Sequence, residues 1–222
     1  MRPLVGPVPE PAERALSALR RSPRASLRTG DSDRPVPLVH AVPGTAEVMV
    51  AVPTGGGAGP VGGTLEDGAE ARLEVLDVVL GGAAAGRCRR VVVVEGRLAI
   101  PDAPAQRRAA SDLARDLPDP ALLDVGTASV LVRLRPERIV LTDHDGVTLV
   151  DPDDLATSGP DPFADLEGLW LAHLGDPRCR VVERLAARLV RCPPSERPLL
   201  VGIDRAGEPF FSHQLRLLKA AG

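Results

Sequence analysis

The feature that most constrains the fold is a series of short segments rich in β-branched residues, each bounded by glycine, proline or aspartate. The clearest is residues 90–100, whose four consecutive valines favour an extended backbone. Similar strands are expected at residues 25–29, 36–42, 47–52, 70–78, 129–134, 138–142 and 147–150. We therefore expect a closed or partly closed barrel, because closure removes exposed strand edges.

Turn signals connect these strands. Residues 135–137, Arg-Pro-Glu, are expected to form a turn between two of them, and residues 143–146 end in the Asp-Gly pair of a hairpin. On the 70–78 strand, Leu73, Val75 and Asp77 are expected to share one face.

Helical patterns frame the strands at Pro11–Arg21 and Pro104–Leu117. After Asp151 the pattern changes to helices at 161–174 and 178–191, a strand at 198–203, another short strand, and a last helix from about Gln214. We predict an α+β chain of three parts. These are a flexible N-terminal arm at 1–10, a barrel domain at 11–152 and a small helical α/β C-terminal domain at 153–222.

Composition narrows the function classes. The net charge of −3 provides no basic field for nucleic acid, and no apolar run approaches the ~18 residues of a membrane span. The three cysteines form no Cys-x-x-Cys pair, which indicates reduced thiols in the cytoplasm rather than a disulfide framework. We expect no membrane partner. A protein that binds nucleic acid through the arginines of residues 178–191 is the third and weakest hypothesis.

Three stretches carry a resemblance to a known family. They are residues 72–77 with 91–98, residues 132–139 (Val-Arg-Leu-Arg-Pro-Glu-Arg-Ile), and residues 159–162 followed by Glu167, His173-Leu174 and 197–207. In this order they resemble actinobacterial proteins related to HugZ-type haem oxygenases, whose small C-terminal domain has no known function. Such proteins join a split β-barrel of the pyridoxamine-phosphate-oxidase, FMN-binding-like type to a small C-terminal domain. Plant proteins that bind glutamyl-tRNA reductase share the layout.

The resemblance implies a split barrel, a homodimer with a cofactor cleft between protomers, and haem or FMN as cofactor. His173 and His213 are then the candidates to touch haem, and Arg72, Arg97 and Arg133 are the candidates to bind a cofactor at the cleft. The chain departs from the family's pattern, however. No arginine or lysine lies between Glu47 and Arg72, where flavin-binding members grip the phosphate, and Arg178 stands where a second histidine is often found.

Other polar residues suggest structural roles. No two histidines stand at helical i, i+4 spacing, so we expect no metal site. His144 is expected to be solvated in its turn and His40 to be hydrogen-bonded in the barrel wall. The aspartates at 151, 153, 154, 161 and 165 are interpreted as helix caps. The glycine-rich loop at 55–63 lacks the lysine and helix start of a phosphate loop.

Arginines at i, i+4 and i+8 form one stripe on the predicted 178–191 helix: Arg180, Arg184 and Arg188. The stripe is interpreted either as a solvated face or as a surface that binds an acidic protein partner or an anionic propionate or phosphate group.

No nucleophile motif is present, and no catalytic residue can be named from the sequence. We therefore expect a non-enzymatic split-barrel binding or regulatory protein with a degenerate flavin site, which binds haem or a partner protein. The alternative is a haem- or flavin-dependent oxidoreductase of the HugZ or pyridoxamine-phosphate-oxidase type.

Overall fold

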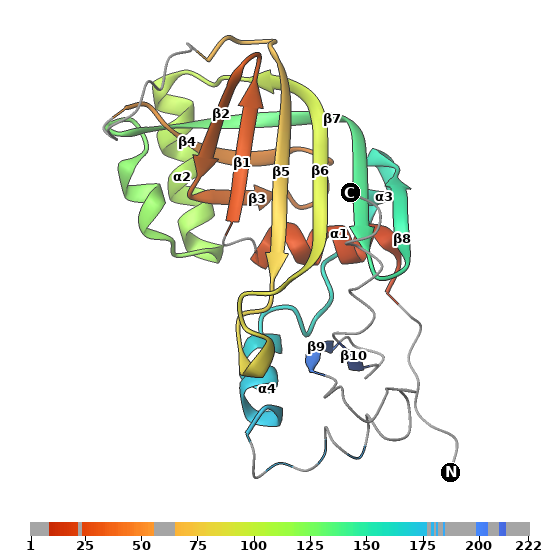
Figure 1. Cartoon of the computed structure of the whole chain (residues 1–222). Coiled ribbons are helices and arrows are strands. Elements are labelled where there is room, and N and C mark those ends of the chain that lie inside the picture. The colour runs from red at the N-terminus through yellow and green to blue at the C-terminus, as the bar shows by residue number, and fades with distance from the viewer. Residues whose placement is uncertain are drawn as a thin grey trace.

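A computed structural model describes residues 9–21, 24–55, 65–176, 179, 181, 184, 199–203 and 209–211. Figure 1 shows a curled sheet with helices at its ends and on one side. The helices are α1 (Pro11–Arg21), α2 (Ala103–Asp116), α3 (Pro152–Thr157) and α4 (Glu167–Leu174), with short 3-10 turns η1 (Gly82–Ala84) and η2 (Pro120–Asp124). The strands are β1 (Arg24–Thr29), β2 (Ser32–Val36), β3 (Leu38–Ala41), β4 (Val48–Pro53), β5 (Glu70–Val78), β6 (Cys88–Ala99), β7 (Ser129–Asp143), β8 (Gly146–Val150), β9 (Leu200–Ile203) and β10 (Pro209–Phe211).

The main sheet is antiparallel throughout and has eight strands in the order β2-β1-β5-β6-β7-β4-β3, with β8 paired to the second half of β7. It curls into a half-barrel of the split-barrel type (Figure 1), which confirms the predicted barrel at this level. The predicted helix at Pro11–Arg21 is also confirmed residue for residue.

The inward face of the sheet forms the main core. Valines and leucines that alternate along β4, β5, β6 and β7 are almost fully buried there, as strands with one covered face require. Helix α1 lies across one end of the half-barrel (Figure 1), and its Ala15, Leu16 and Leu19 enter the same core. Leu155 of α3 is 1% exposed and packs there too.

A second core lies outside the sheet. Helix α2 is capped by Asp102, which accepts a hydrogen bond from the backbone of Ala105. Its Ala110 and Leu113 pack on the outward-facing Ala51 and Leu131 of β4 and β7. This helix covers one part of the outer sheet face, whereas strands β5, β6 and β8 lie beyond it (Figure 1).

Two predicted boundaries were wrong. Residues 135–137 do not form a turn, because β7 runs unbroken from Ser129 to Asp143 and absorbs Pro136 at a register shift opposite Glu95 and Gly96 of β6. A proline is tolerated in a strand at such an irregularity. The single strand predicted at 36–42 is divided, since β2 ends at Val36 and β3 begins at Leu38.

The C-terminal part builds a third, smaller core. Leu171 of α4 packs with Val79, Ala84 and the β9 residues Leu200 and Val201. The predicted 161–174 helix is shorter than expected, because turns occupy 162–166 before α4 begins. The predicted arm at 1–8, most of the 178–191 helix and the last helix lie outside the described residues. The domain boundary near residue 152 stays a prediction.

Within the described part of the chain, no helix has the length and apolar character needed to cross a membrane.

The register shift in β7 generates a stability prediction. A Cβ added at Gly96 would lie 1.9 Å from the carbonyl oxygen of Arg135, so Gly96→Ala forces the two strands apart. We expect a loss of about 2–4 kcal/mol in the free energy of unfolding, measured by urea denaturation.

Gly159→Ala is the matched control for this substitution. A Cβ at Gly159 meets nothing within 4 Å, and its φ lies outside the left-handed region. An equal loss in both variants would contradict the assignment of the effect to the β6–β7 contact.

Candidate functional site

The most concentrated set of buried charges lies where the half-barrel meets the C-terminal part. The Arg89 guanidinium donates from Nε to Asp77 Oδ2 at 3.0 Å and from Nη1 to Glu167 Oε1 at 2.6 Å. Arg89 also donates to the carbonyl oxygen of Val201 at 2.7 Å, and Glu167 Oε1 accepts from the backbone of Ile203 at 3.0 Å. One arginine thus joins strands β5 and β6 to α4 and β9.

Two further arginines enter this cluster. Arg21, at the end of α1, pairs with both Asp77 and Glu167, and Arg90 approaches Asp77 Oδ2 at 3.3 Å. The side chains of Asp77 and Glu167 are 0% and 3% exposed. We call Asp77, Arg21, Arg89, Arg90 and Glu167 the junction cluster.

A β-bulge explains how two consecutive arginines of β6 reach one carboxylate. Asp77 pairs with Arg90 and Val78 pairs with Cys88, which leaves Arg89 as the extra residue. In a regular strand, neighbours point to opposite faces, but at a bulge two residues oppose one and the alternation breaks. Arg89 and Arg90 are therefore both buried beside Asp77.

The arginines keep the cluster ionised. Burial by itself raises the pKa of Asp77, but Arg89, Arg21 and Arg90 more than offset it, and the net pKa is below the usual value. Burial lowers the pKa of Arg89, yet Asp77 and Glu167 reverse the effect and raise it overall. Burial lowers the pKa of Arg90 to about 10, still well above neutrality.

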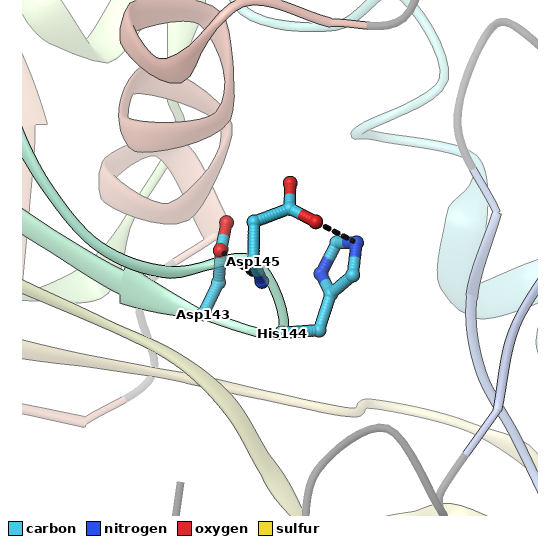
Figure 2. A group of neighbouring side chains, drawn as sticks. All are labelled: Asp143, His144 and Asp145. Atoms are coloured by element: carbon cyan, nitrogen blue, oxygen red, sulfur yellow. Dashed lines mark hydrogen bonds and ion pairs between the residues drawn. The ribbon is translucent and has the colours of Figure 1, made fainter. Parts of the chain in front are cut away.

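A second polar group lies on the β7–β8 hairpin. Figure 2 shows Asp143, His144 and Asp145 close together, with their potential ligand atoms within 4.8 Å of one another. Arg14 of α1 already sits between the carboxylates, 3.3 Å from Asp143 Oδ2 and paired with Asp145. A guanidinium in that place supplies the positive charge that a metal ion would bring.

The prediction that His144 is solvated was wrong, because its side chain is only 16% exposed. Burial lowers the pKa of His144, and the nearby carboxylates of Asp145 and Asp143 oppose the shift. His40 lies on β3, half-buried in the barrel wall, and burial, followed by the charge of Arg20, lowers its pKa.

The three arginines proposed to bind a cofactor lie on three adjacent strands at the outer face of the sheet, and each is paired with glutamate. Arg72 contacts Glu95 at 2.6 Å, Arg97 contacts Glu70 at 3.2 Å, and Arg133 contacts Glu47 at 3.3 Å. All three side chains are between 43% and 53% exposed. They form cross-strand ion pairs rather than one convergent anion clamp.

His173 lies in the last turn of α4 and is exposed. Its ring meets Trp170 edge-on, with 6.4 Å between ring centroids. Leu166, Leu169 and Trp170 are 51%, 71% and 46% exposed at helical spacing from His173. We call these four residues the α4 face. It is an apolar surface that carries one imidazole.

Other predicted positions are less informative. His213, Arg180 and Arg188 lie outside the described residues, and Arg184 is exposed. Of the predicted caps, Asp151 caps α3 by accepting from the backbone of Asp153, whereas Asp165 instead pairs with Arg20 at 2.8 Å. Sequence reasoning placed Asp77 on one face with Leu73 and Val75, which the structure buries, but missed the junction cluster.

Comparisons with known proteins bear on the fold. No family model matches the chain, and no curated protein matches it. Among solved structures, it is similar to a haem-binding protein from Mycobacterium smegmatis, with a TM-score of 0.50, 18% identity, and 90% of this chain and 82% of that chain covered. This likeness indicates a shared fold.

Two further solved structures are less similar to this chain, and no inference is drawn from them. An FAD- and haem-binding protein from Mycobacterium smegmatis has a TM-score of 0.38 and 20% identity, with 66% of this chain and 76% of that chain covered. The protein Atu2129 from Agrobacterium tumefaciens, of unknown function, has a TM-score of 0.40 and 15% identity, with both chains covered in full.

The junction cluster yields a prediction for Glu167→Gln. Removal of this carboxylate charge leaves Arg21 and Arg89 buried with Asp77 alone, and breaking a buried ion pair costs about 3–5 kcal/mol. Asp165→Asn is the control, because its pair with Arg20 is exposed and contributes at most about 1 kcal/mol. Urea denaturation of both variants measures the difference, and similar losses would contradict the role assigned to Glu167.

The lowered pKa of Asp77 predicts a pH dependence. The folded protein holds the carboxylate more strongly than the unfolded chain, whose aspartates titrate near ~3.9. Its stabilising contribution is therefore complete above about pH 5 and is lost as pH falls below about 4 through the folded pKa. The stability gap between the native protein and Asp77→Asn should narrow in that acid range, and a gap that instead narrows between pH 6 and 8 would contradict this.

Proposed function

We propose that this chain is a non-enzymatic, haem-binding split-barrel protein that works as a homodimer. The observation that carries the proposal is the α4 face, where His173 stands among exposed leucines and a tryptophan. Exposed apolar side chains grouped around one polar residue are typical of a ligand or partner surface.

The α4 face fits the chemistry of haem. A haem needs apolar surface for its macrocycle and an axial ligand for its iron, and histidine is a common one. Leu166, Leu169 and Trp170 would supply the surface and His173 the ligand. A bound haem would supply an iron centre. The solved haem-binding protein with the same fold adds support by analogy of fold alone.

The outer sheet face fits a flavin phosphate poorly. Flavin phosphates are usually held by arginine or lysine together with backbone N–H groups. Arg72, Arg97 and Arg133 are already paired with Glu95, Glu70 and Glu47. Recruiting them would require breaking several ion pairs, which supports haem over FMN.

The same sheet face supports a homodimer. Two cross-strand rows of largely apolar residues lie on it, in register Leu76–Val91–Thr142–Val147 and Val93–Val140–Leu149. Val147 and Leu149 are 68% and 66% exposed. Beside these rows lie the alternating arginines and glutamates of β5, β6 and β7. Such a mixed-charge border can pair with a second copy of itself.

Titration with haem tests the ligand. We expect a Soret band and a dissociation constant that rises at least about tenfold in His173→Ala, because an axial ligand is worth more than ~1.4 kcal/mol. His40→Gln, on β3, should bind as the native protein does. Unchanged binding by His173→Ala would rule out this site, and binding of FMN alone would favour the flavin alternative.

Turnover distinguishes a binding protein from an enzyme. The haem-loaded protein, given a reductant and oxygen, should keep its Soret band. Breakdown of haem at about 1 s⁻¹ or faster would overturn the non-enzymatic proposal.

Light scattering tests the dimer. Leu149→Glu should convert the dimer to a monomer, because it places a charge in the apolar rows. Leu123→Glu is the control, since Leu123 is 85% exposed on η2, away from β8. A native protein that is monomeric, or a dimer that survives Leu149→Glu, would contradict this interface.

A further inference from the structure

A small cavity lies between α1, β6 and residues 161–167. Its volume, taken as the space open to the centre of a water molecule, is about 10 Å³. Its lining includes Arg14, Ser17, Arg21, Asp161, Ala164 and Glu167. This space is close to the roughly 10–15 Å³ that one buried water requires, and it is far too small for a cofactor.

Two arginines whose Nε atoms lack a hydrogen-bond acceptor indicate that the cavity holds a small polar molecule or ion. Arg14, Ser17 and Arg21 stand at i, i+3 and i+7, so α1 presents them on one face. The side chains of Arg14 and Arg21 are each 8% exposed, and the Nε atom of each is buried without a hydrogen-bond acceptor. Leaving a buried charged donor unsatisfied is costly, and such groups are usually paired with protein or with ordered water.

The charges around the cavity decide between a water and a small anion. Four arginines contribute positive charge, namely residues 14, 21, 89 and 90. Four buried carboxylates oppose them, at residues 77, 143, 161 and 167, whereas Asp145 is 53% exposed. The buried charges therefore balance, and a chloride would add an unpaired negative charge to them, whereas a neutral water adds none.

We propose that this cavity is a binding site for one structural water. The water accepts hydrogen bonds from Nε of Arg14 and Nε of Arg21, and its own hydrogens face a lining that includes the Asp161 and Glu167 carboxylates. It links α1 to residues 161–167 beside the junction cluster, where Ser17 Oγ already accepts from the backbone of Asp161 at 2.8 Å.

A crystal structure of the full chain grown in sodium bromide tests the occupant. We expect one oxygen-sized peak within hydrogen-bonding distance of both Nε atoms and no anomalous signal at the bromine edge. An anomalous peak would identify an anion site. A cavity without density would mean that the site is dry. Either result overturns the proposal.

Substitution of Ala164 tests the site in solution. A serine hydroxyl there should take the place of the water, so the melting temperature of Ala164→Ser should change by less than about 2 °C. Ala71→Ser is the control, because it buries a hydroxyl in the apolar core, where we expect a fall of about 3–10 °C. An equal fall in both variants would show that the cavity offers no hydrogen-bond partners.

Discussion

The pairing of Arg89 with Asp77 and Glu167 is the interaction on which the arrangement of this molecule depends. The half-barrel has its own apolar core, and the C-terminal part has a separate, smaller one. Apolar packing is non-directional, so it does not fix how two such bodies meet. The Arg89 guanidinium fixes how the two parts meet, because its hydrogen bonds to two carboxylates and to the Val201 carbonyl are satisfied in one orientation only.

This arrangement does not have to be the most stable one. Taking charges out of water is expensive, and a buried ion pair is often no better than apolar residues of the same volume. What it adds is a strong penalty for any other arrangement, since a shift of α4 would leave buried arginines without Glu167. We interpret the junction cluster as a device for specificity, in the way that buried polar residues fix register in helical assemblies.

Much of the fold could be predicted because it depends on local patterns. The valine run of β6, the Asp-Gly hairpin and the stripe of α1 each signal their element within a few residues. The junction cluster could not be predicted, because it depends on a bulge that reverses the side-chain direction of Arg89, which strict alternation would place on the opposite face from Arg90. The continuity of β7 through residues 135–137 was missed for a related reason. Pro136 signals a turn locally, and only the register with Gly96 lets the strand continue.

The candidate site, like the fold, could be predicted from the sequence only in part. His173 could be singled out from sequence, but its exposure beside Trp170 could not, because an apolar helix is ordinarily expected to be buried. The arginines at 72, 97 and 133 were chosen by residue type, and only the strand register reveals that glutamates already neutralise them.

The bulge at Arg89 also limits how this architecture can vary through evolution. A half-barrel that carries Asp77 beside the bulged Arg89 and its neighbour Arg90 is left with excess buried positive charge unless the C-terminal part brings a carboxylate to position 167. The two parts are therefore not interchangeable modules. A C-terminal part taken from a relative can replace this one only if it restores that carboxylate, so the two segments are expected to be inherited and to diverge as a pair.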